Sequence, residues 1–285
     1  MINFWPSELD IKIVDQIIDI ALEEDIGHGD LTSKAVITPE TIFTGAMSAR
    51  EEMVCAGLPI AGRIFTRYSK DIIWEADVID GEKVAGNTTL ARISGPAIDL
   101  LTAERTAINI LQYLSGIATL TREYVEAISD MDTILLDTRK TTPVYRHLAK
   151  YATRMGGATN HRMALDDGVL IKDNHIAVAG NITEAVRRAQ KAKLKKIEVE
   201  CDNLDQVKDA VKAGADMILL DNMTANQMKE AVELVNGKIP TEASGDIDID
   251  TIRTKAATGV TYLSVGRLTH SAPAVNIGLD WSHRV

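Results

Sequence analysis

The second half of the chain alternates short apolar segments with helical segments, and this constrains the fold more than any other feature. Six short segments, most of them apolar runs, predict strands, at 133–137, 168–172, 196–200, 216–221, 241–245 and 261–266. Strands that are apolar throughout and alternate with helices form a parallel sheet with both faces covered. Six such units in succession favour an α/β barrel over an open sheet.

The sequence also predicts where the helices between these strands begin and end. Asn181 with Glu184, and Thr224 with Gln227, have the spacing of capping boxes. Asp248 is expected to cap a helix over 249–258. Glycines stand where helices should end, at Gly214, Gly237 and Gly259.

The first half follows a different pattern. A helix is predicted over 8–24, and strand-like runs at 41–49, 72–76 and 90–94 are separated by turn residues. A long helical stretch follows over 97–131, in which Gly116 is expected to introduce a kink or an end. We therefore expect a small α+β unit ahead of the barrel.

Composition excludes several classes of protein. The 285 residues suffice for one large domain or two smaller ones. A net charge of −10 and 4% aromatic residues argue against a nucleic-acid binder. Two cysteines, Cys55 and Cys201, cannot form a disulfide framework or a closed zinc site. No signal peptide and no apolar run of about eighteen residues is found, so we expect a cytoplasmic protein without a membrane span.

Each predicted strand ends in polar residues or glycine. These ends are 137–140, 172–174, Glu200, 221–222, 244–245 and Gly266. In parallel α/β barrels the carboxyl ends of the strands build the active site. Six such ends predict a functional site there.

Residues 138–175 form a basic region in an acidic protein. Arg146, Lys150 and Arg154, spaced four apart, could be a solvated helix face. That alternative does not explain the cations at or near strand ends, which are Arg139, Lys140, Arg162 and Lys172. Guanidinium and ammonium groups bind carboxylates and phosphates, so we expect a small ligand with several negative charges.

Two carboxylates, Glu200 and Asp221, end neighbouring strands and would repel such a ligand. A magnesium ion between carboxylates and ligand oxygens would resolve this. Hydrogen bonds to ribose hydroxyls, or structural pairing with a basic neighbour, are the alternatives. The segments 244–246 and 265–267 place small residues before helix N-termini, where backbone N–H groups bind anions.

These residues belong to longer motifs. They are EDIGHGDLT at 24–32, ERTAIN at 104–109, LSGIAT at 114–119, DTRKTTP at 137–143, NHR at 160–162, LIKDNH at 170–175, LDNM at 220–223, EASG at 242–245, SVG at 264–266 and LTHS at 268–271. With them the sequence closely resembles the quinolinate phosphoribosyltransferase family over nearly its whole length.

The resemblance implies a reaction and a fold. Members condense quinolinate with phosphoribosyl pyrophosphate, using Mg²⁺, and yield nicotinate mononucleotide, pyrophosphate and carbon dioxide in the de novo route to NAD. The implied fold is an N-terminal α/β sandwich, here 1–112, followed by an incomplete TIM-like α/β barrel, here 113–269. The tail 270–285 would pack back on the first domain. Homodimers form the unit, and hexamers occur.

The resemblance also implies roles for individual residues. Arg105 would reach from one subunit into its partner's site. Quinolinate carboxylates would be held by Arg105, Arg139, His161, Arg162 and Lys172. Lys140 and Lys172 would also face the phosphoribosyl group, and Thr138 is a further substrate-binding residue. Glu200 and Asp221 would bind ribose hydroxyls or magnesium. The phosphate would be wrapped by Ser244, Gly245, Asp246, Val265, Gly266 and Arg267. Of all these, Lys140, Lys172, Glu200 and Asp221 are the catalytic candidates.

The expected chemistry fits these groups. Displacing pyrophosphate builds negative charge on the leaving group, which lysines and magnesium stabilise. Loss of carbon dioxide leaves electrons at a carbon beside the cationic ring nitrogen, so no further cofactor is needed. A lysine or a water is expected to protonate that carbon.

The sequence departs from the family pattern at three positions, where Val144, Ala158 and Asp246 stand in place of glycine. Two other functions remain as alternatives. One is a ModD-type paralogue of the same fold that acts on a different acceptor. The other is a non-catalytic nucleotide-binding protein.

Overall fold

The computed structural model describes residues 5–7 and 9–281, and the chain forms two compact units. The first contains 1–122, 142–157 and 271–285, and the second contains 123–141 and 158–270. This differs from the expected division into 1–112 and 113–269, because helix α4 (Ala97–Ala127) continues past residue 112. Its later residues Leu114, Ile117 and Ala118 are fully buried in the core of the first unit. Residues 1–4, 8 and 282–285 of the expected segments lie outside the described residues.

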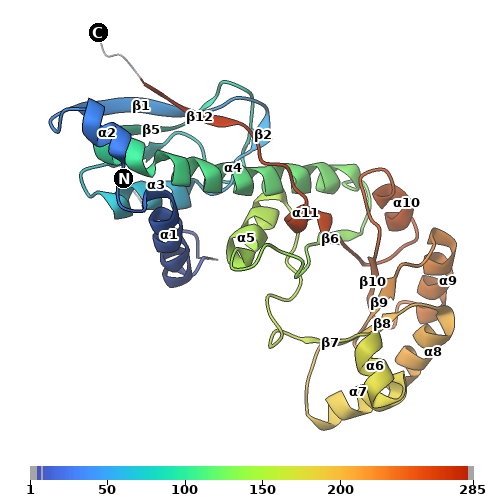
Figure 1. The fold of residues 1–285 in the computed structure, drawn as a ribbon. Helices are drawn as coiled ribbons and strands as arrows, with labels where there is room; N and C mark the ends of the chain where they lie inside the picture. The colour runs from blue at the N-terminus through green and yellow to red at the C-terminus, as the bar shows by residue number, and fades with distance from the viewer. Residues whose placement is uncertain (1–4, 8, 282–285) are drawn as a thin grey trace. The chain divides into compact units, whose positions relative to one another are not determined.

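The first unit contains a four-stranded antiparallel sheet, drawn beside helix α4 in Figure 1. Its order is β12 (Ile277–Trp281), β1 (Ile42–Ala49), β5 (Thr89–Pro96) and β3 (Ile73–Ala76). The short strands β2 (Met53–Val54) and β4 (Lys83–Val84) pair separately. The end of the chain therefore adds an edge strand to β1, with Ala49 opposite Ile277.

Five helices complete the first unit and supply most of its apolar core. They are α1 (Ile11–Ile26), α2 (Leu31–Val36), α3 (Leu58–Tyr68), α4 and α5 (Arg146–Gly156). Gly116 does not end α4, contrary to one expectation, because the helix runs through it. A Cβ at this position would lie 2.0 Å from the carbonyl oxygen of Pro273, so the close approach of the tail requires glycine.

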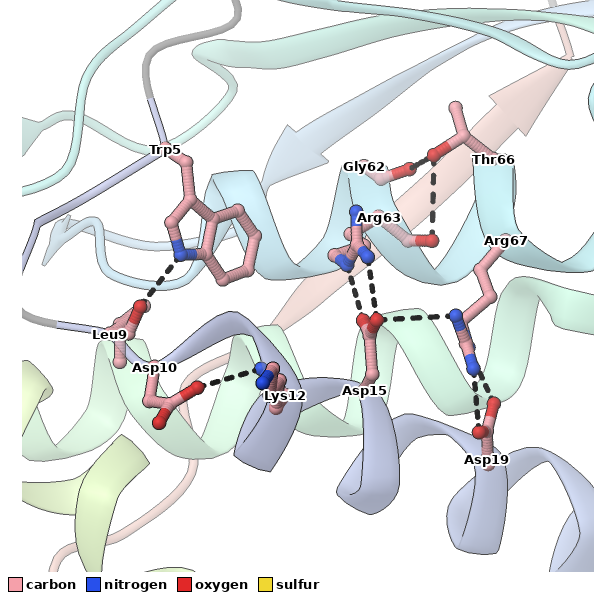
Figure 2. A network of polar contacts seen from close by, with 10 residues as sticks. All are labelled: Trp5, Leu9, Asp10, Lys12, Asp15, Asp19, Gly62, Arg63, Thr66 and Arg67. Atoms are coloured by element: carbon pink, nitrogen blue, oxygen red, sulfur yellow. Dashed lines mark hydrogen bonds and ion pairs between the residues drawn. The ribbon is translucent and has the colours of Figure 1, made fainter.

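A polar network ties α1 to α3 (Figure 2). Arg63 donates two hydrogen bonds to the Asp15 carboxylate, and Arg67 donates to both Asp15 and Asp19. The hydrogen bond from Arg63 holds the pKa of Asp15 below its usual value. Because 15 and 19, like 63 and 67, are one helical turn apart, the two helices pair along matching faces.

The second unit contains a six-stranded parallel sheet. Its order is β6 (Ile134–Leu136), β11 (Tyr262–Ser264), β10 (Thr241–Ser244), β9 (Met217–Asp221), β8 (Ile197–Cys201) and β7 (Val169–Ile171). All six predicted strands are present, and each pair is parallel. The first two strands of this unit, β6 and β7, form the two edges, so the barrel is incomplete. The predicted combination of an N-terminal α/β domain and an incomplete barrel is confirmed.

Connecting helices follow most of the predicted boundaries. They are α6 (Asp173–Ala179), α7 (Ile182–Lys191), α8 (Leu204–Ala213), α9 (Ala225–Val235), α10 (Ile252–Ala256) and α11 (Arg267–His270). Asn181 caps α7, and Thr224 with Gln227 forms a capping box on α9. The predicted helix over 249–258 is shorter, because Asp248 accepts hydrogen bonds from Thr251 and the helix begins only after Thr251.

Candidate active site

The carboxyl ends of the parallel strands surround a cavity of about 830 Å³ in the second unit. Parallel strands carry the residues after each strand to the same edge of the sheet, so distant segments meet here. Fourteen of the fifteen predicted substrate-binding residues line the cavity: Thr138, Arg139, Lys140, His161, Arg162, Lys172, Glu200, Asp221, Ser244, Gly245, Asp246, Val265, Gly266 and Arg267. The fifteenth, Arg105, is an exposed residue of α4 in the first unit and is not among the lining residues.

Cations dominate one part of the cavity wall. Burial lowers the pKa of Arg162, and the nearby charge of Arg139 lowers it further. The guanidinium of Arg162 donates to the carbonyl of Gly168 at 3.2 Å. Cations held this close together in a partly buried wall favour an anionic ligand, whose charge offsets their mutual repulsion.

Glu200 and Asp221 line the cavity near the ends of the neighbouring strands β8 and β9. Lys172 donates from Nζ to Oε2 of Glu200 at 2.6 Å, and Glu200 is only 8% exposed. Burial raises the pKa of Asp221, and the Glu200 carboxylate adds to the rise. Asp221 accepts a hydrogen bond from the Asn222 amide at 2.7 Å. Glu200 thus has a basic partner. An additional cation nearby would stabilise the charged form of Asp221.

Asp137 positions the 160–162 segment at the edge of the sheet. It lies directly after β6 and is fully buried. Its carboxylate accepts from the Asn160 side chain at 2.6 Å and from the His161 N–H at 2.9 Å. A single carboxylate at a strand end therefore brings His161 and Arg162 to the cavity.

The imidazole of His161 contacts protein groups on both sides. Nε2 lies 3.3 Å from Glu198 and 3.4 Å from Glu242, and Nδ1 accepts the Arg162 N–H at 2.7 Å. Burial lowers the pKa of His161, but hydrogen bonds to Glu198 and Glu242 outweigh it and raise the pKa to about 9. The Arg162 N–H opposes this rise, because a charged ring has no lone pair at Nδ1.

Two loops present free backbone N–H groups at the cavity. In the described part of the chain, the N–H groups of Gly245, Asp246, Ile247, Gly266 and Arg267 have no acceptor. Gly245 has φ 87°, and a Cβ there would lie 2.0 Å from Oδ1 of Asn222. Glycine is therefore required at 245. Unpaired N–H groups that line a cavity form a binding site for an oxyanion such as phosphate.

Comparison with known proteins identifies the family. The family model for the quinolinate phosphoribosyl transferase C-terminal domain matches residues 117–280. The family model for the N-terminal domain matches residues 30–115. The chain belongs to the quinolinate phosphoribosyltransferase family.

Individual relatives agree with this family membership. The probable nicotinate-nucleotide pyrophosphorylase [carboxylating] of Bacillus subtilis is 40% identical over 90% of this chain and 89% of that protein. The corresponding Mycobacterium leprae protein is 38% identical over 96% and 99%. The solved nicotinate-nucleotide pyrophosphorylase of Francisella tularensis superimposes with a TM-score of 0.92 at 39% identity, covering 99% of each chain.

Several lining residues of this family member were missed by sequence reasoning. They are Leu170, Leu219, Glu242, Ile247, Asp248, Ser264 and His270. Glu242 had a usable signal, because it stands inside a predicted strand of a sheet covered on both faces, where a buried carboxylate needs a partner. Leu170 and Leu219 had none, since parallel strands are apolar on both faces.

The basic helix face considered above is only partly solvated. Lys150 of α5 is fully buried, whereas Arg154 is exposed, so the interpretation of Arg146, Lys150 and Arg154 as a solvated face is wrong for Lys150. All three belong to the first unit and do not line the cavity. Among the described residues, no helix carries an apolar stretch long enough to span a bilayer.

Proposed function

We propose that this cavity binds quinolinate and phosphoribosyl pyrophosphate. The chain then transfers the phosphoribosyl group to quinolinate with loss of carbon dioxide, giving nicotinate mononucleotide and pyrophosphate. One observation carries the proposal: clustered cations, two adjacent carboxylates and two loops of unpaired N–H groups line the same cavity. Its volume of about 830 Å³ lies within the range typical of small-molecule sites.

Quinolinate is assigned to the cationic wall. Arg139, Arg162 and Lys172 offer charged donors for its two carboxylates. His161, whose Nε2 faces Glu198 and Glu242, adds positive charge when it is protonated. His161 is assigned to binding rather than base catalysis, because the attacking pyridine nitrogen carries no proton.

The phosphoribosyl group is assigned to the loops that follow β10 and β11. The 5′-phosphate would accept from the N–H groups of 245–247 and 266–267, with Ser244, Val265 and Arg267 beside it. Lys140 lines the same cavity and would lie close to the leaving pyrophosphate. Charge develops on that group during transfer, so a nearby ammonium lowers the barrier.

Glu200 and Asp221 fit a magnesium ion. Both are oxygen donors, and burial, together with the nearby Glu200 charge, raises the pKa of Asp221, so a bound cation would stabilise the two carboxylates. Mg²⁺ bound there, or hydrogen bonds to ribose hydroxyls, would use the same two carboxylates. When bound, the metal would stabilise negative charge on pyrophosphate. We expect chelation with EDTA to abolish turnover and added Mg²⁺ to restore it.

Decarboxylation needs no additional group from the protein. The electron pair left by carbon dioxide lies on the carbon beside the ribosylated, cationic nitrogen, which stabilises it. Lys140, Lys172 or water would supply the proton. The same residues thus serve both steps.

The assembly is proposed to be a homodimer, with hexamers as a larger form, in the cytoplasm. Arg105 would complete the quinolinate site of the partner subunit. We expect mixed dimers of Arg105→Ala with Lys140→Ala to regain activity, because one site then has both residues intact. Verified mixed dimers without activity would contradict the shared site.

The decisive experiment measures labelled carbon dioxide released from carboxyl-labelled quinolinate, with Mg²⁺, in the presence and absence of phosphoribosyl pyrophosphate. Release that depends on both substrates supports the proposal. Folded protein that binds phosphoribosyl pyrophosphate but releases nothing would favour a ModD-type acceptor if nicotinate reacts instead. It would favour a non-catalytic nucleotide-binding protein if no acceptor reacts.

A further inference from the structure

Lys255 of α10 is attached to the loop that follows β10. Its Nζ donates to the carbonyl of Gly245 at 2.5 Å and to the carbonyl of Asp246 at 3.1 Å. The side chain is partly buried. One ammonium group therefore fixes two successive peptide units of this loop.

The direction of these carbonyls decides the direction of two N–H groups. In a trans peptide the C=O and the following N–H point in opposite directions, and the described chain contains no cis peptide. With both carbonyls bound to Lys255, the N–H groups of Asp246 and Ile247 point away from it. Those N–H groups have no acceptor within the described residues, and both residues line the cavity.

Asp246 makes such an anchor necessary. It is exposed, lies in the left-handed region with φ 45°, and stands where the family pattern has glycine. A carboxylate beside a phosphate site repels the ligand. Burial lowers the pKa of Lys255, whereas the negative charges of Asp246, Asp248 and Asp221 act in the opposite direction and favour the ammonium that offsets them.

We propose that Lys255 is a positioning residue for phosphate binding: it holds the Gly245 and Asp246 carbonyls so that the next two N–H groups face the cavity, and it compensates the Asp246 carboxylate. This inference rests on the proposed role of the 244–248 loop in binding the phosphate of phosphoribosyl pyrophosphate.

Steady-state kinetics of Lys255→Met tests this role. We expect the KM for phosphoribosyl pyrophosphate to rise by about tenfold, the factor that corresponds to one weakened charged hydrogen bond. The KM for quinolinate should change less than twofold, because its cations lie on other strands. Lys229→Met is the matched control, since Lys229 is an exposed lysine of the neighbouring helix α9 outside the cavity lining.

The Asp246→Gly background separates positioning from direct phosphate contact. There the carboxylate is gone, so we expect Lys255→Met to raise the KM for phosphoribosyl pyrophosphate by only about threefold. An equal penalty in both backgrounds would indicate that Lys255 contacts phosphate directly and would overturn the inference. No penalty in either background would also overturn it.

Binding of inorganic phosphate, followed by calorimetry, keeps this test independent of the reaction. We expect Lys255→Met to weaken phosphate binding even if quinolinate were not the acceptor, so a failure of the proposed function would be recognised separately. If Lys255→Met does not fold, Lys255→Gln, which retains a donor but loses the charge, replaces it. Unchanged phosphate affinity in a folded variant would refute the positioning role.

Discussion

Val144 occupies a backbone conformation that β-branched residues rarely adopt, and replacing it should stabilise the protein. Tyr145 N–H donates to the Thr142 carbonyl at 3.2 Å, closing a turn with Pro143 and Val144 at its centre. Val144 has φ 71°. Proline followed by positive φ defines a type II turn, whose third residue is normally glycine or asparagine.

The size of the effect follows from three contributions. A left-handed conformation costs an L-residue about 1–2 kcal/mol, and the upper value suits a β-branched side chain. Val144 is 69% exposed, so its removal loses only about 0.5 kcal/mol of apolar burial. Glycine loses roughly 0.5 kcal/mol more in conformational entropy on folding. Val144→Gly should therefore stabilise the native state by about 1 kcal/mol.

Urea denaturation followed by circular dichroism measures this difference. Val178→Gly is the matched control, because Val178 is 88% exposed within helix α6, where glycine is unfavourable. We expect the two variants to shift the urea midpoint in opposite directions. A lower midpoint for Val144→Gly, or equal shifts in both variants, would refute the assignment of strain to Val144.

Further predictions concern the buried charged groups. In NMR, His161 should titrate above the ordinary histidine pKa of 6.5. Protonated His161 therefore stabilises the folded state fully below pH 6.5, and this stabilisation is lost as the pH rises through the pKa of the folded state. Glu242→Gln removes one of its two anionic neighbours and should lower that pKa by about one unit; an unchanged titration would contradict the role of Glu242. Tyr151→Phe removes the hydrogen bond to the Asp80 carboxylate at 2.6 Å, so we expect about 1–2 kcal/mol of destabilisation in urea, and none if that bond contributes nothing.

The sequence predicted the strands and helix caps well, because each depends on residues within one short segment. All six barrel strands appear, because short segments, most of them rich in apolar residues, alternate regularly with helical segments. The caps at Asn181 and Thr224 also appear, since a cap involves only residues within one turn. The cavity residues at strand ends followed from the same reasoning, because parallel strands bring their ends together.

Non-local partners escaped sequence reasoning. The family resemblance implied that the tail returns to the first domain, but no periodicity in 277–281 predicts that β12 pairs with β1, more than 200 positions away. Gly116 resembled a helix breaker, yet it is present because Pro273 approaches α4 there. The burial of Lys150 could likewise not be predicted from the sequence, because helical spacing does not show which face of a helix packs against other elements.

The sequence by itself determined the order of elements, the parallel sheet and the strand ends that carry charge, because these depend on spacing within short segments. Only the tertiary structure decided which groups act on each other across that framework. His161 came to lie between Glu198 and Glu242, and Lys255 came to hold the loop at Gly245. Such contacts depend on a few ångströms of packing between distant segments, and no local pattern of residues encodes that distance.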